Sequence, residues 1–202
     1  MRFIKTTTIV LSVFVFLVFL LISGLFFAVE GGVLDLSSEP QSKAPTNTTG
    51  VPVVSASNHP HVDGDALEIV IYKEVNDRRE AAEIEPLVHS ERVRLIARLH
   101  SKDMAERNFF DHKNPDGHGS SERHKSYDGC DNTNENIFQW VNLTTYDSEK
   151  IANEVVNWWA DSSGHNTTMM SDYPTVTGVG VHVTEEGDLY VTQNFCREHP
   201  NA

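Results

Sequence analysis

Two histidines and two glutamates lie in separate stretches of the middle of the chain: His112 after Phe-Phe-Asp, Glu135 in Asn-Glu-Asn-Ile, Glu154 beside a Trp-Trp pair and His165 after Ser-Ser-Gly. Imidazole binds metals and exchanges protons near neutral pH, and a carboxylate can orient an imidazole. We therefore take these four residues as the candidate site. The chain has ten histidines, so spacing alone leaves open that the four positions are unrelated.

The elements that would position these residues begin with two predicted helices. The first begins near Asp65 as its cap and extends for about fifteen residues. Its inner face repeats apolar residues every four positions: Leu67, Ile71 and Val75. A second helix is predicted from Ser90, as N-cap, to about Arg107. The second helix ends shortly before His112, so His112 is expected in the loop that follows it.

A third helix and a set of strands complete the predicted domain. The helix covers Ser148 to about Ala160, has Asp147 or Ser148 as its cap, and ends just before His165. Residues 177–183 and 189–196 alternate with period two around a hairpin turn, and 135–140 is a strand or an irregular extended segment. Helices followed by strands indicate an α+β layered domain.

The remaining histidines have simpler interpretations. His100 lies on the apolar face of the second helix and is expected in the core or at its boundary. His118 and His124 lie in a polar stretch and are expected at the surface. His59 and His61 lie in a segment with linker composition, so we expect them to be solvated.

The N-terminal part of the chain predicts a membrane anchor. Residues 9–29 form an uncharged apolar run, which is long enough for a helix to cross the roughly 30 Å hydrocarbon core. Arg2 and Lys5 precede the run, so the positive-inside rule keeps residues 1–8 in the cytoplasm and places the rest outside. Residues 30–64 read as a flexible linker, 65–197 as the domain and 198–202 as a tail. The alternative is a cleaved signal peptide and a secreted domain.

Charge and cysteine content narrow the classes of function. The net charge of −13 argues against a nucleic-acid partner, because phosphate binding needs a basic face. The chain has two cysteines, Cys130 and Cys196. In an exported domain they form either a disulfide, which would add about 3–5 kcal/mol, or two buried thiols.

From about residue 66 to residue 196 the chain resembles the CAP family, which comprises cysteine-rich secretory proteins, antigen 5 and pathogenesis-related 1 proteins. The similarity is to the cysteine-poor microbial type. It rests on eight short matches in family order: 75–79, 85–87, 100–105, 109–112, 134–137, 159–165, 178–180 and 190–195.

The resemblance implies a three-layer α-β-α sandwich with an open cleft that carries two histidines and two glutamates. His112, Glu135, Glu154 and His165 match those positions, and the resemblance implies that His112 and His165 bind a divalent metal such as zinc. One departure is Asn134, where the family usually has glycine; asparagine tolerates left-handed backbone angles better than most residues.

Two classes of function agree with these residues. The first is a membrane-tethered, exported module whose cleft binds a divalent metal and a small or lipid-like ligand or a surface protein. The alternative is a metal-dependent hydrolase of peptides, esters or cell-wall material that uses the same four residues. The chain contains neither His-Glu-x-x-His nor Gly-x-Ser-x-Gly, so the hydrolase hypothesis depends on the four residues alone.

Overall fold

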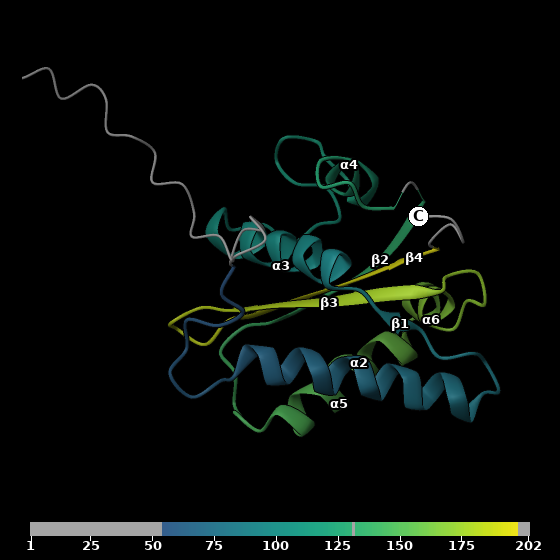
Figure 1. Ribbon diagram of the computed structural model, residues 1–202. Helices are drawn as coiled ribbons and strands as arrows, with labels where there is room; N and C mark the ends of the chain where they lie inside the picture. The colour runs from purple at the N-terminus through teal and green to yellow at the C-terminus, as the bar shows by residue number, and fades with distance from the viewer. Residues whose placement is uncertain (1–53, 131, 198–202) are drawn as a thin grey trace, which may run out of the picture. The chain divides into compact units, whose positions relative to one another are not determined.

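A four-stranded sheet forms the centre of the domain, as the computed structural model of residues 54–130 and 132–197 shows (Figure 1). Its strands are β1 (Val88–His89), β2 (Thr133–Trp140), β3 (Val176–Val183) and β4 (Leu189–Cys196), in the order β1-β3-β4-β2. β1 and β3 are parallel, and the other neighbours are antiparallel. The segment that the sequence left as a strand or an irregular segment is the regular strand β2.

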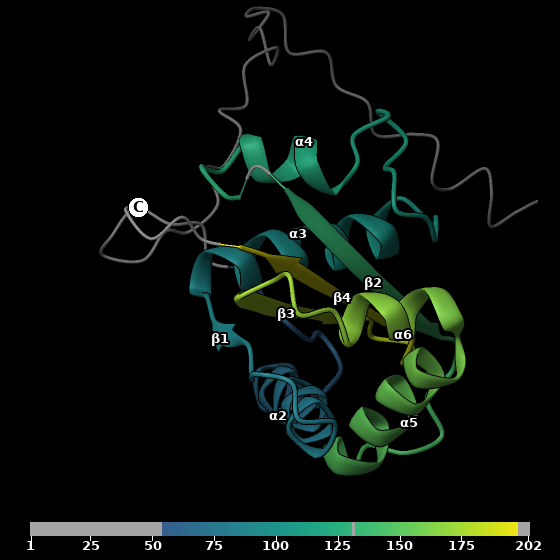
Figure 2. The same ribbon diagram turned by 90° about the vertical axis from the view of Figure 1, so that its right-hand side faces the viewer.

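Helices cover both faces of this sheet (Figures 1 and 2). One face carries α3 (Glu91–Glu106) and α4 (Ser120–Lys125), and the other carries α2 (Gly64–Ala81), α5 (Ser148–Asp161) and α6 (Ser163–Met169). The predicted α+β class is therefore confirmed, and the layers follow the order helix, sheet, helix. The short helices α4 and α6 were not predicted.

The helix starts depend on side-chain caps. Ser90 accepts from the Val93 amide of α3, as predicted. Of the two predicted caps of α5 it is Asp147 that accepts from the first-turn amides. The predicted cap of the first helix is wrong. Asp63, rather than Asp65, accepts from the amide of Ala66 at 3.0 Å, and the helix begins earlier in consequence. A capping side chain must precede the first helical residue so that its oxygen can reach the free amides.

The main core lies between the sheet and the pair α2 and α5. Both helices bury apolar residues at helical spacing: Leu67, Ile71 and Val75 from α2, and Ile151, Val155 and Trp159 from α5. The Trp159 indole donates to the carbonyl of Ile137 at 3.0 Å, which satisfies its polar atom inside the core. This contact fixes α5 against β2 and so fixes the two elements that carry Glu154 and Glu135.

On the other face of the sheet, two positions of β3 must be glycine because α3 lies against them. A Cβ at Gly180 would lie 2.0 Å from the backbone nitrogen of Arg98, and one at Gly178 would lie 2.1 Å from that of Arg94. Both obstacles are backbone atoms of α3, which cannot rotate away. The two glycines of β3 therefore allow α3 to lie directly on the sheet.

Residues 54–63 belong to the folded part, although their composition resembles a linker. Val54, Ala56 and Val62 are buried. The Asn58 amide donates to the Val183 carbonyl at 2.8 Å, at a part of the β3 edge that the two-residue β1 does not reach. Covering this edge removes a site for pairing with another strand.

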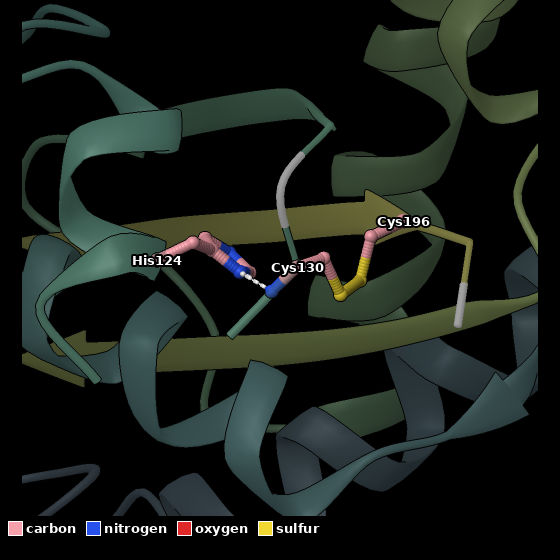
Figure 3. Close-up of side chains that lie close together, drawn as sticks. All are labelled: His124, Cys130 and Cys196. Carbon is pink, nitrogen blue, oxygen red and sulfur yellow. Dashed lines mark hydrogen bonds between the residues drawn. A yellow bond between two sulfur atoms is a disulfide. The ribbon is translucent and has the colours of Figure 1, made fainter. Parts of the chain in front are cut away.

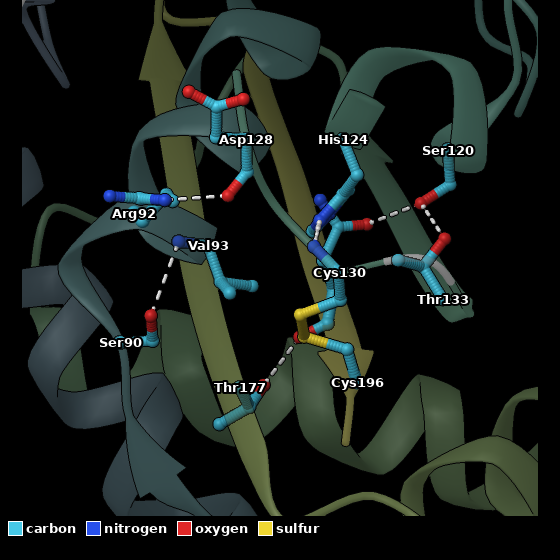
Figure 4. The surroundings of a disulfide bond; sticks show 11 residues. Ser90, Arg92, Val93, Ser120, His124, Asp128, Cys130, Thr133, Thr177 and Cys196 are labelled. Carbon is cyan, nitrogen blue, oxygen red and sulfur yellow. Dashed lines mark hydrogen bonds between the residues drawn. A yellow bond between two sulfur atoms is a disulfide. The ribbon is translucent and has the colours of Figure 1, made fainter. Parts of the chain in front are cut away.

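The predicted cysteine pair is a disulfide. Cys130 and Cys196 are joined across a sequence separation of 66 residues, which ties the turn after α4 to the end of β4 (Figure 4). Beside it, Thr133 donates to Ser120, which donates to the side chain of Asn194. The disulfide and these bonds hold α4 against the sheet.

The predicted cytoplasmic segment (1–8), membrane span (9–29) and tail (198–202) lie outside the described residues. Within residues 54–130 and 132–197, no helix is both long and apolar enough to cross a bilayer.

Candidate functional site

His112 and Glu135 are in direct contact. His112 lies in the loop between α3 and α4, and its Nδ1 is 3.0 Å from Oε1 of Glu135 on β2. The Glu135 side chain is 3% exposed and that of His112 is 52% exposed. Because a carboxylate only accepts, Nδ1 of His112 carries the proton, and Nε2 is left with a free lone pair when the ring is neutral.

Arg123 of α4 is a site residue that the sequence analysis missed. Its Nη2 donates to Oε2 of Glu135 at 2.5 Å, and its Nη1 donates to the carbonyl of His112 at 3.0 Å. Burial raises the pKa of Glu135, but the hydrogen bond from His112 and the charge of Arg123 outweigh it and hold that pKa below its ordinary value. Glu135 is therefore an ionised carboxylate, and it orients the His112 ring.

His165 lies in the first turn of α6 and belongs to the same group. Its Nδ1 is 2.8 Å from the hydroxyl of Ser162, and its ring lies 4.8 Å from that of Trp158. Burial lowers the pKa of His165, and the charge of His112 lowers it further. The carbonyl of His165 accepts from the side chain of Asn136, the residue after Glu135 on β2, at 3.0 Å, which places His165 beside the strand that carries Glu135. α5 ends at Asp161, close to the predicted end near Ala160, and the unpredicted helix α6 begins at Ser163.

Glu154 is placed differently. It is exposed on α5, four residues before Trp158 and so on the same helix face. Its side chain makes no hydrogen bond or ion pair with another residue of the described chain. The structure therefore brings His112 and Glu135 into contact and places His165 beside β2. Glu154 is linked to His165 only through Trp158, whose helix face it shares.

The three grouped residues have the donor chemistry of a metal site. Both histidines are held at Nδ1, and Nε2 of neither ring has a partner among the residues described. A histidine held at one nitrogen by a carboxylate is the usual arrangement of a metal ligand, because it fixes the tautomer and the direction of the other nitrogen. Binding of a divalent cation such as zinc by His112 and His165 stays a prediction of the resemblance, and the donor chemistry of the two rings agrees with it.

A second group of potential metal ligands has a structural role. A ring nitrogen of His124 and the sulfurs of Cys130 and Cys196 all lie within 4.8 Å of one another (Figure 3). Metals bind cysteine as a thiolate, and these sulfurs are bonded to each other. His124 instead accepts from the Cys130 amide at 3.2 Å, which positions the disulfide. The expectation that His124 is a surface residue is wrong, since it is fully buried; His118 is exposed and His100 is buried, as expected.

Acid is expected to destabilise the fold through His124. Burial lowers its pKa from 6.5 to about 4, so folding favours the neutral ring. This contribution to stability is complete above pH 6.5 and is lost as the pH falls toward 4, by up to roughly tenfold in the folding constant per pH unit. The lowered pKa of His100 likewise favours the fold at higher pH. The raised pKa of His112 has the opposite effect and favours the fold at lower pH.

Urea unfolding at several pH values tests this expectation with the variant His124→Gln, whose side-chain oxygen can still accept from Cys130. The variant should lose less stability than the wild type between pH 6.5 and 4. Parallel losses in the two proteins would show that His124 is not responsible.

The fold and the His-Glu group define a CAP-type domain, and comparison with known proteins agrees. The sequence model of the cysteine-rich secretory protein family, CAP, matches residues 72–195. The chain belongs to this family.

Three individual proteins resemble the chain at 30% sequence identity or lower. An uncharacterized protein of Bacillus subtilis, YkwD, is 30% identical over 160 residues, which cover 79% of this chain and 55% of YkwD. The chain thus matches about half the length of that relative. An outer surface protein of Borrelia burgdorferi superposes with a TM-score of 0.60 at 17% identity, over 68% of this chain and 97% of that one. An extracellular SCP-domain protein of Bacillus anthracis superposes with a TM-score of 0.54 at 25% identity, over 66% of this chain and 41% of that one.

Proposed function

We propose that the protein is an exported domain, anchored to the cell membrane by residues 9–29, in which His112 and His165 bind a divalent cation. The proposed partner of this centre is a small or lipid-like ligand or a surface protein. One observation carries the proposal: both rings are held at Nδ1, by Glu135 and Ser162, with both Nε2 atoms free of partners in the described chain. A bound zinc ion acts as a Lewis acid for an oxygen ligand.

Export has support besides the apolar segment. Two structural relatives are described as an outer surface protein and an extracellular protein, and a disulfide is typical of oxidising compartments. Cell fractionation tests the anchor. The full chain should remain in the membrane fraction after a salt wash, and recovery of a shortened, soluble protein from the medium would contradict it.

Zinc titration by calorimetry tests the metal centre. The wild-type protein, purified in detergent, should bind one zinc ion, and His112→Ala combined with His165→Ala should abolish this binding. Glu135→Gln keeps the shape of the side chain but loses the charge that orients His112, so zinc affinity should fall by about 10–100-fold.

The matched control is His59→Ala combined with His61→Ala, which removes two histidines that pack against Tyr146. This control should bind zinc as the wild type does. Equal binding by the His112/His165 variant and the wild type would overturn the proposal.

A metal-dependent hydrolase is the second candidate, and it has one observation in its favour. The carboxylate of Glu154 is exposed and has no partner in the described chain, unlike that of Glu135, so it is the free base that hydrolysis would need. Hydrolysis of peptide, ester or cell-wall substrates that is lost in Glu154→Gln, with zinc affinity unchanged, would favour the enzyme. Absence of hydrolysis by the zinc-loaded wild type would exclude these substrates.

A further inference from the structure

The outer edge of β2 is unpaired where the strand begins. β2 is the last strand of the sheet and pairs only with β4. Figure 2 shows it with α4 on one face of the sheet and α6 on the other. At the opposite side of the sheet, residues 54–58 cover part of the edge of β3, but no described segment pairs with the outer edge of β2. Because unpaired edges accept further strands, this edge is a candidate binding surface.

Alternate residues of β2 turn their main-chain groups toward this outer edge. In an antiparallel strand the N–H and C=O of one residue point to the same side, and the side alternates along the strand. The carbonyl of Ile137 accepts from the Trp159 indole and so points away from β4. Thr133 and Glu135 lie four and two residues before Ile137, so their N–H and C=O groups point outward as well. Within the described chain these four groups have no hydrogen-bond partner.

The register of the sheet gives the same alternation. The carbonyl of Val183 on β3 accepts from Asn58 at the opposite edge of the sheet, so it does not point to β4. The partner of Val183 across the ladder is Leu189, which therefore turns its main-chain groups to β2. Leu189 in turn pairs with Trp140, so the even-numbered residues of β2 face β4 and the odd-numbered ones face outward.

The first part of this edge is accessible to solvent. Asn134 is exposed and Thr133 is half-buried. Glu135 is half-buried as a whole residue although its side chain is only 3% exposed, so most of its accessible surface belongs to the main chain. Farther along the strand, Ile137 is buried and its carbonyl is covered by Trp159. The open stretch is therefore residues 133–135.

An extended polypeptide is the ligand whose chemistry matches this stretch. The outward groups of Thr133 and Glu135 repeat a donor and an acceptor at the two-residue spacing of a strand. The main chain of an extended peptide presents the complementary acceptors and donors at the same spacing, as when a peptide adds a strand to a sheet. A lipid or a small molecule lacks this repeat.

The two histidines of the proposed metal centre flank this stretch from opposite faces of the sheet. Successive side chains of a strand point to opposite faces. The side chain of Glu135 contacts His112 on one face, and that of Asn136 donates to the carbonyl of His165 on the other. A peptide that pairs with residues 133–135 therefore passes beside both histidines.

Charge indicates which kind of peptide is favoured. The chain has a net charge of −13, so a second copy of it would bring the same negative charge to the contact. Residues 30–53 of the chain itself contain three acidic residues and one lysine. Since like charges disfavour association, both are poorer occupants of the edge than a basic segment of another protein.

We propose that the outer edge of β2 at residues 133–135 binds an extended, basic peptide segment of another protein as an added strand. The inference deepens the proposed function, because it names the kind of partner that meets the centre at His112 and His165. The pairing itself uses main-chain groups and needs no metal, so only its place beside the proposed cation rests on the proposed function.

Amide hydrogen exchange followed by NMR tests the proposal with the peptide Lys-Val-Thr-Val-Lys, blocked at both ends. Its β-branched residues favour an extended chain. The full-length protein is kept in detergent with EDTA, which removes divalent cations. At a peptide concentration of roughly ten times the Kd, the amides of Thr133 and Glu135 should exchange about tenfold more slowly, since a bound amide is protected. The same peptide with glutamate in place of lysine should bind more weakly.

The variant Thr133→Pro blocks the edge. It removes one outward N–H and places a ring there, which the first residue of an edge strand tolerates. Peptide binding should weaken by about tenfold, because a hydrogen bond is lost and the ring hinders the added strand. The matched control is Thr133→Val, which also loses the hydroxyl bond to Ser120 but keeps the N–H, and it should bind the peptide as the wild type does.

Unchanged exchange at both amides in excess lysine peptide would overturn the proposal, as would equal binding by Thr133→Pro and Thr133→Val. Equal binding of the lysine and glutamate peptides would overturn the basic character of the partner. Peptide binding by a protein that takes up no zinc would contradict the metal centre alone, and zinc binding without slowed exchange would contradict the peptide site alone. Far-UV circular dichroism checks that each variant is folded.

Discussion

Replacing Arg98 with methionine is expected to lower the free energy of unfolding by about 3–5 kcal/mol, because it leaves a buried carboxylate without its main partner. Glu68 is 2% exposed and accepts from Nε and Nη2 of Arg98 at 2.5 and 2.6 Å. Arg98 also donates to the carbonyl of Val54 at 3.0 Å. The pair thus connects α2, α3 and the first described residues.

The carboxylate of Glu68 also accepts a hydrogen bond from the backbone of the sheet. The amide of Val181 on β3 donates to Oε1 of Glu68 at 2.9 Å. Burial raises the pKa of Glu68 in spite of the two arginines beside it. In Arg98→Met only Arg94, at 3.2 Å, remains to balance the charge, so the carboxylate would take up a proton or draw in water and loosen α2.

Urea unfolding of three variants checks this account. Arg92→Met, on the exposed side of the same helix, removes a hydrogen bond to the carbonyl of Asp128 and should change stability by about 1 kcal/mol or less. Arg98→Met combined with Glu68→Leu should recover much of the loss, since no buried charge remains. The account fails if Arg98→Met is as stable as Arg92→Met, or if the double variant is less stable than Arg98→Met alone.

Loss of the disulfide should have a comparable effect. Cys130 and Cys196 close a loop across 66 residues, and constraining such a loop in the unfolded chain is worth about 4 kcal/mol. The variant with both cysteines replaced by serine should unfold at a correspondingly lower urea concentration than the oxidised wild type.

A reductant provides the control for the disulfide. Dithiothreitol should lower the stability of the wild type toward that of the double variant and should leave the variant unchanged. If the oxidised wild type and the variant unfold at the same urea concentration, the disulfide does not contribute to stability.

Much of the fold could be predicted because local patterns agree with the tertiary structure. Ser90 precedes an amphipathic segment and caps it as predicted, and Asp147, one of two predicted caps, does the same for α5. The alternating residues of β3 and β4 form strands with a tight turn between them. His112 and Glu135, which the family resemblance assigned to one cleft, are in contact, whereas their spacing alone left this open.

The parts of the structure that could not be predicted have no recognisable local sequence pattern. α4 consists of six residues, Ser-Ser-Glu-Arg-His-Lys, with no apolar spacing, so Arg123 and His124 resemble surface residues. Both are buried because the disulfide and β2 hold this segment against the sheet. Residues 54–63 look like a linker because their few apolar side chains become buried only when β3 offers its edge.

The most direct test of the proposed metal centre is a crystal of the zinc-loaded protein measured on both sides of the zinc absorption edge. We predict a single anomalous peak in contact with Nε2 of His112 and Nε2 of His165, with Glu135 still bonded to Nδ1 of His112. A peak at His124 or at His59 and His61, or no peak near His112 at saturating zinc, would contradict the proposal.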